Sequence, residues 1–218
     1  MNISTGNILP PRGPGNVWPH RVSLCPLIQG ITDMGILLAF APFIAFAIVD
    51  RLLGSAEGLC AGFAVSAMLL VRDWLSPDRA PKLLEIGTAI LFGALAAYAL
   101  LRRPDWSIVG VRLAVDSGLL LIVLISIAIR QPFTLQYARE QVARELWRSP
   151  EFLRTNDVIT AVWALAFTAL VIADIVLLYV PELPPRFGII VSILALVGAV
   201  KFTAWYPERR GGMVQTTP

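Results

Sequence analysis

Long apolar segments, separated by gaps that are alternately rich and poor in arginine, constrain this chain more than any other feature. A helix that crosses the hydrocarbon core of a bilayer needs about 20 predominantly apolar residues. Inside the bilayer only helices and closed barrels satisfy all their backbone groups. The sequence therefore predicts an all-α fold, a polytopic membrane helix bundle with about six transmembrane helices. The apolar segments cover residues 34–53, 56–72, 83–101, 107–129, 158–180 and 187–206.

Composition supports a membrane environment and excludes several other classes. Hydrophobic residues make up 56% of the 218 residues and charged residues 15%, against about 25% charged in soluble domains. The net charge of +3 reflects loop arginines, so no nucleic-acid partner is expected. A single histidine, His20, and two cysteines, Cys25 and Cys60, offer no ligand set for haem or zinc. We expect no cofactor, no metal and no disulfide.

The first two segments are the weak point of the six-helix interpretation. Their uncharged runs cover only 34–49 and 58–71, and Pro42 lies inside the first run. Such segments are compatible with two short spans or with a re-entrant hairpin whose tip stays inside the protein. Both alternatives return the chain to the side from which it started.

The distribution of lysine and arginine predicts the orientation. With six crossings, twelve basic residues fall on one side and four on the other. Cytoplasmic loops carry the excess of basic residues, so both termini are expected in the cytoplasm. The larger group contains Arg12, Arg21, Arg72, Arg79, Lys82, Arg130, Arg139, Arg144, Arg148, Arg154, Arg209 and Arg210, and the smaller group contains Arg51, Arg102, Arg103 and Arg186.

The domain organisation follows from these segments. Residues 1–30 are rich in proline and glycine and predict a flexible N-terminal tail, and 208–218 predict a flexible C-terminal tail. The bundle occupies 31–207. Within the bundle, Ser149 followed by Pro150 predicts an N-cap and the first residue of a helix.

The gap between the fourth and fifth segments predicts a cytoplasmic amphipathic helix over 133–148. An apolar stripe faces one side and arginines the other, as in interfacial helices. The helix could pack on its own bundle or dock a partner, and the sequence leaves both open. The stripe contains Leu135, Val142 and Leu146, and the polar side contains Arg139, Arg144 and Arg148.

Small residues recur at every fourth position in the second and third segments. Such stripes allow helix backbones to approach closely in lipid. The favoured interpretation is packing within the chain, and the alternative is homo-oligomerisation through one stripe. The first stripe contains Gly58, Gly62 and Ser66, and the second contains Ala89, Gly93 and Ala97.

Four ionisable residues fall inside the apolar segments. Arg112 and Asp116 are four residues apart and share one face of the fourth segment, while Asp174 enters the fifth from the same side of the membrane. At about 1.5 Å per residue these three lie at similar depths, so one arginine can serve two carboxylates. Lys201 lies near the opposite surface and can snorkel to it. The trio is interpreted as a structural ion pair or as a site for protons or cations.

Several local features recur in a fixed order along the apolar segments: Pro42 in the first segment, Val71-Arg72, Arg130-Gln131-Pro132, and Ala161-Val162-Trp163-Ala164 after Asn156. This order resembles the intracellular septation protein A family of small bacterial inner-membrane proteins, over roughly 35–206. The resemblance implies a multispanning protein of the bacterial inner membrane, linked to envelope integrity and septation, that acts through contacts with other membrane proteins. Asp174 stands where the family leads us to expect a neutral amide.

Two functions compete on this evidence. The leading hypothesis is a non-enzymatic membrane scaffold or accessory subunit, whose partners are the lipid bilayer and other membrane proteins. The alternative is a small proton-coupled carrier that uses Asp116 and Asp174. A lipid-handling enzyme is disfavoured, because the sequence contains no serine elbow, no His–Asp cluster and no metal-ligand spacing.

Overall fold

A computed structural model describes residues 38–76, 81–102, 107–140, 142, 144–180 and 182–213. Within these residues every regular element is helical. The tail predicted over 1–30 lies outside the described residues, as do the side chains of Arg79, Arg103 and Arg210. The elements are α2 (Ala41–Leu52), α3 (Ser55–Leu75), α4 (Leu83–Arg102), α5 (Ile108–Ala128), α6 (Phe133–Arg139), a 3-10 turn (Arg144–Leu146), α7 (Pro150–Tyr179) and α8 (Arg186–Met213).

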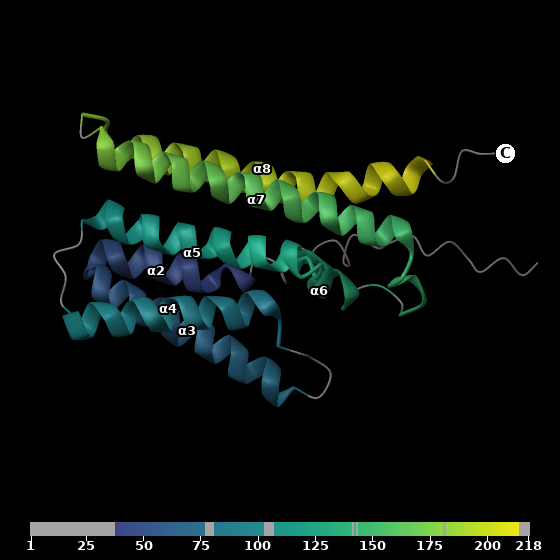
Figure 1. The fold of residues 1–218 in the computed structure, drawn as a ribbon, viewed down its shortest axis with the longest axis horizontal. Coiled ribbons are helices and arrows are strands. Elements are labelled where there is room, and N and C mark those ends of the chain that lie inside the picture. The colour runs from purple at the N-terminus through teal and green to yellow at the C-terminus, as the bar shows by residue number, and fades with distance from the viewer. Residues whose placement is uncertain are drawn as a thin grey trace, which may run out of the picture.

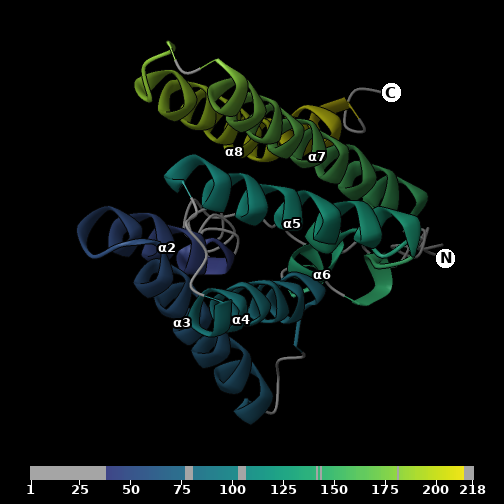
Figure 2. The ribbon, with the colours of Figure 1, turned by 60° about the vertical axis from the view of Figure 1, so that its left-hand side comes forward.

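The long helices run up and down beside one another (Figure 1). Each of them packs on a neighbour in the order α2, α3, α4, α5, α7 and α8. In the second view α7 and α8 form one side of the bundle, α5 lies next to α7, and α2, α3 and α4 lie beyond it (Figure 2). Short α6 lies at one end, with the end of α3, the start of α4 and the start of α7 (Figure 1). We call this the α6 end.

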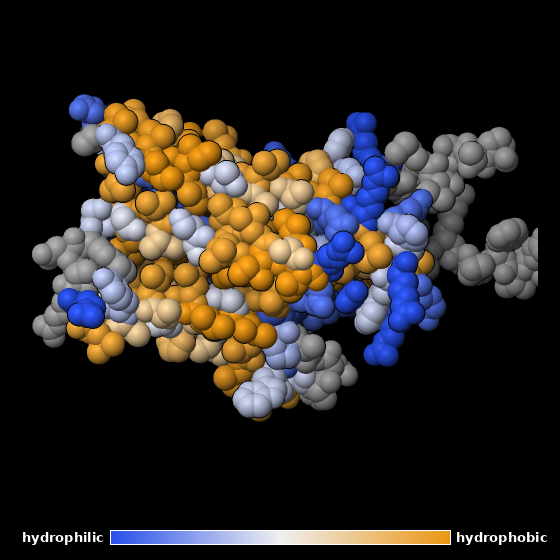
Figure 3. Space-filling view, in the orientation of Figure 1, coloured by the Kyte–Doolittle hydropathy of each residue, from blue (hydrophilic) through white to orange (hydrophobic). Residues whose placement is uncertain are grey.

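Five of the helices, α3, α4, α5, α7 and α8, are long and apolar enough to cross a membrane. An apolar surface covers the middle of the molecule, and hydrophilic residues gather at the α6 end (Figure 3). The architecture is that of a multi-pass helical membrane protein. The 12 residues of α2 rise only about 18 Å, less than the hydrocarbon core of about 30 Å, and residues 34–37 of the first segment lie outside the described residues.

From its uncharged run we predicted that the second segment is short, but the structure shows that it is not. It forms a single helix of 21 residues, α3, which continues through Arg72 and Asp73 to Leu75. The helix can continue through the buried Asp73 because ion pairs with Arg72 at 2.6 Å and with Lys82 at 3.1 Å compensate the charge of its carboxylate. The predicted shortness of the second segment is therefore wrong, and the choice between two spans and a re-entrant hairpin stays a prediction from the sequence.

The continuous helix predicted over 133–148 is also wrong. The helix ends at Arg139, and a separate 3-10 turn follows at Arg144–Leu146. Phe133 and Leu135, which point to opposite sides of α6, are both buried, so α6 packs inside the bundle. Beyond it, the Trp147 indole donates a hydrogen bond to the Val142 carbonyl at 2.9 Å and closes a turn.

Helix α7 begins eight residues before the fifth apolar segment, and α8 ends seven residues after the sixth. The predicted N-cap is confirmed: Ser149 Oγ accepts from the Phe152 amide at 3.3 Å, and α7 begins at Pro150. At the other end of the chain α8 continues through Pro207 to Met213. The first residues of the predicted C-terminal tail, 208–213, are therefore helical.

Two apolar clusters hold the layers together. One surrounds Phe92, between α2, α3, α4 and α5. The other surrounds Trp163 and includes Phe133 of α6 and Phe167 of α7. Phe40, just before α2, stacks on Trp163 with ring centroids 4.9 Å apart. This contact ties the start of α2 to the α7–α8 pair.

Candidate functional site

Arg112, Asp116 and Asp174, which we call the intramembrane cluster, come together between α5 and α7. Arg112 Nη2 lies 3.4 Å from Asp174 Oδ1. The same nitrogen donates to Ser192 Oγ of α8 at 3.3 Å. The cluster therefore connects three helices at membrane depth.

Asp174 occupies the most enclosed position in this cluster. Its side chain is 1% exposed, whereas that of Arg112 is 23% exposed. Neither carboxyl oxygen of Asp174 accepts a hydrogen bond from an N–H or O–H donor of the described residues. A buried carboxylate without donors is costly, so its stabilisation depends on Arg112 and on Asp116.

Asp116 stands within electrostatic range of both other members. Its carboxyl interacts with the Asp174 carboxyl and with the Arg112 guanidinium. The cluster thus contains two acidic groups and one permanently charged base. With both carboxyls ionised it would carry one net negative charge in a medium of low dielectric constant.

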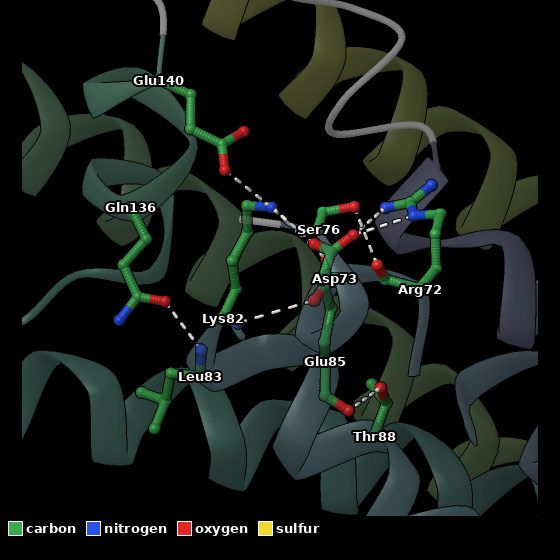
Figure 4. Close-up of polar contacts among 9 residues, drawn as sticks. All are labelled: Arg72, Asp73, Ser76, Lys82, Leu83, Glu85, Thr88, Gln136 and Glu140. Carbon is green, nitrogen blue, oxygen red and sulfur yellow. Dashed lines mark hydrogen bonds and ion pairs between the residues drawn. The ribbon is translucent and has the colours of Figure 1, made fainter. Parts of the chain in front are cut away.

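A second polar cluster at the α6 end was not predicted from the sequence (Figure 4). Its centre is Lys82, whose side chain is only 6% exposed. The ammonium lies 3.0 Å from Glu140, 3.1 Å from Asp73 and 3.6 Å from Glu85. We call these four residues the Lys82 cluster.

The Lys82 cluster is charged and enclosed. Burial lowers the pKa of Lys82, but the carboxylates of Glu140, Glu85 and Asp73 together raise it by more, to above the ordinary lysine value. The ammonium also lies 4.9 Å from the centre of the Tyr137 ring, a cation–π contact. Burial and nearby carboxylates raise the pKa of the Tyr137 hydroxyl as well. Lys82 therefore stays a cation at neutral pH, and Tyr137 stays a phenol.

Further hydrogen bonds fix α6 beside this cluster. The Leu83 amide donates to Gln136 Oε1 at 2.7 Å. On the other side of α6, Thr134 Oγ1 lies 2.7 Å from Thr160 Oγ1 and donates to the Asn156 carbonyl at 3.1 Å. The start of α4 and the first turns of α7 therefore hold α6 between them.

The predicted small-residue positions lie mostly between helices of the same chain. A Cβ on Gly58 would meet the backbone of Asp50 in α2, one on Gly62 would meet Phe92 in α4, and one on Gly93 would meet Phe63 in α3. Ser66 and Ala89 are buried. Ala97 differs, because it is exposed and faces away from the packed side of α4.

The remaining predicted residues differ in exposure, and Arg139 and Val142 are half-buried. Lys201 is exposed on α8, consistent in position with a side chain that reaches for the interface. Arg144 and Arg148 are exposed, and Leu146 between them is 53% exposed. Arg139 and Arg144 each lie over the ring of Trp147, at 5.6 and 5.8 Å. Leu135, in contrast, is buried.

Comparisons with protein-family models, curated proteins and solved structures give no match to this chain. Among the described residues, no group of three or more His, Cys, Asp and Glu side chains is arranged to hold a metal ion.

Proposed function

We propose that this protein is a non-enzymatic scaffold or accessory subunit of the bacterial inner membrane, with both termini in the cytoplasm and six crossings. The orientation is supported by the hydrophilic surface at the α6 end (Figure 3), where the cytoplasmic side is expected to carry the basic residues. The resemblance to the septation protein A family supports a role in envelope integrity and septation. In this proposal the α6 end is the part of the protein that contacts division or wall-synthesis proteins at the inner membrane.

The observation that carries the scaffold proposal is the surface segment Arg144–Arg148. It projects from a fixed base, because α6 is held by the Lys82 cluster and by Gln136. An exposed leucine between exposed arginines is a combination suited to contact with a partner that is apolar at its centre and acidic at its rim. We propose that this segment is the docking surface.

Site-directed photocrosslinking in native membranes tests the docking surface. A photoreactive residue at Leu146 should give a discrete protein adduct, whereas one at Leu165, which is 70% exposed in the middle of α7, should give lipid adducts. Replacing both Arg144 and Arg148 with glutamate should lower the adduct yield by about tenfold, because rim charges act on the rate of encounter. Equal yields at the two positions, or a chain that purifies alone from cross-linked membranes, would contradict the scaffold.

A small proton-coupled carrier is the second candidate, favoured by one observation. Asp174 is buried at membrane depth with no hydrogen-bond donor among the described residues, beside a second carboxyl on a neighbouring helix. Ionisable residues at such depth commonly lie on ion or proton pathways.

Proteoliposomes loaded with a pH-sensitive dye test the carrier. Wild-type protein should dissipate a proton gradient imposed across the vesicle membrane. Asp116→Asn and Asp174→Asn should each reduce this flux by at least about tenfold, which corresponds to about 1.4 kcal/mol. The matched control Asp157→Asn, on an exposed aspartate of α7, should retain it. Proton flux that persists in both Asp116→Asn and Asp174→Asn would contradict the carrier function.

A further inference from the structure

The charges of the intramembrane cluster do not balance if every group is ionised. Arg112 supplies one positive charge, and Asp116 and Asp174 supply two acidic groups. Arg112 is the cation that acts on both carboxyls, and Lys201 is exposed nine residues beyond Ser192 on α8, about 13 Å farther along the helix. One excess negative charge would therefore remain.

An uncompensated charge at this depth is strongly unfavourable. Transfer of an isolated carboxylate into a medium of low dielectric constant is so costly that the group takes up a proton instead. Two carboxyls in contact behave the same way, since like charges at close range cannot both ionise and the pair shares a proton. Neutrality requires one proton for the cluster.

The geometry indicates which carboxyl carries that proton. Asp174 is the group that lies 3.4 Å from the guanidinium, so Asp174 is stabilised as the carboxylate. Its oxygens are buried and accept no hydrogen bond from N–H or hydroxyl groups of the described residues. The neighbouring Asp116 carboxyl, when protonated, has the O–H donor that Asp174 lacks.

We propose that Asp116 and Asp174 form a proton-binding site, in which a neutral Asp116 donates a hydrogen bond to the Asp174 carboxylate and Arg112 neutralises the remaining charge. The ligand is a single proton. Its release leaves a net negative charge between α5 and α7, so release is coupled to the packing of these two helices. The inference deepens the second proposed function, the proton-coupled carrier. It rests on that proposal only for the role of the bound proton in transport.

Difference infrared spectroscopy of the full chain in lipid vesicles tests the site. Wild-type protein at neutral pH should show the carbonyl stretch of a protonated carboxylic acid, and labelling of aspartate with carbon-13 should shift that band. Asp116→Asn and Asp174→Asn should each abolish the aspartate band, while Asp157→Asn should retain it. Asp116→Asn should fold, because it leaves Arg112 paired with Asp174.

The labelled wild-type spectrum decides the matter even where a variant fails to fold. Absence of an aspartic acid band at neutral pH, or its persistence in both cluster variants, would overturn the shared proton. A labelled band without proton flux in vesicles would support the site and remove only the carrier. Flux without the band would overturn the site and leave a carrier that uses another ligand.

Discussion

Lys82→Met should destabilise the protein by about 3–5 kcal/mol, the usual consequence of removing one partner from a buried ion pair. The ammonium is the shared partner of Asp73, Glu85 and Glu140, and the first two are almost completely buried. Methionine keeps the length of the side chain but leaves these carboxylates without it. Thermal unfolding in lipid nanodiscs measures the loss.

The pH dependence of Lys82→Met identifies the cause. As pH falls, the carboxylates that lost their cation become protonated and the desolvation penalty shrinks. The difference in unfolding free energy between wild type and variant should therefore narrow toward acid pH. The matched control is Lys201→Met, in which an exposed lysine of α8 is replaced and stability should be retained. Equal losses in the two variants, or a difference that does not change with pH, would contradict a buried ion cluster.

Hydropathy predicts the long helices because the bilayer imposes one length and one composition on every crossing. Because each residue of a helix adds the same rise, the depth of a residue in the membrane can be estimated by counting from the end of its segment. The pairing of Arg112 with Asp174 could be anticipated in this way, since both lie a similar number of residues from the same surface. Counting residues does not predict the hydrogen bond from Arg112 to Ser192, because a serine in an apolar helix gives no signal of its own.

The Lys82 cluster was beyond prediction for a physical reason. Lys82 and Asp73 lie near the ends of apolar segments, where charged residues normally meet water, so the sequence places Lys82 among the cytoplasmic loop cations. Its burial depends on α6, which joins the start of α4 through Gln136 and Leu83, 53 residues apart in the chain. Amphipathic periodicity suggested a surface helix at this place. Burial of Tyr137 and Thr134 shows that tertiary packing overrides the periodic pattern.

Gly58→Val should be the most damaging of the small-residue substitutions. A Cβ at this position would lie 2.9 Å from the backbone nitrogen and 3.0 Å from the Cα of Asp50. Backbone atoms cannot rotate away as the end of a side chain can. The α2–α3 turn is also short and tied by a hydrogen bond of 2.6 Å from Ser55 Oγ to Asp50 Oδ1, so α2 has to move as a whole. Overpacking of this kind costs about 2–3 kcal/mol.

Gly198→Val on α8 is the matched control, because no atom lies within 4 Å of its added Cβ. Its thermal midpoint in nanodiscs should equal that of wild type, whereas Gly58→Val should unfold at lower temperature and lose cross-linking between cysteines placed on α2 and α3. If Gly58→Val is as stable as Gly198→Val, α2 does not pack on α3 through this glycine. If both variants lose stability, the exposed face of α8 is itself a packed surface in the membrane. The comparison therefore distinguishes a small residue required inside the bundle from one that faces lipid.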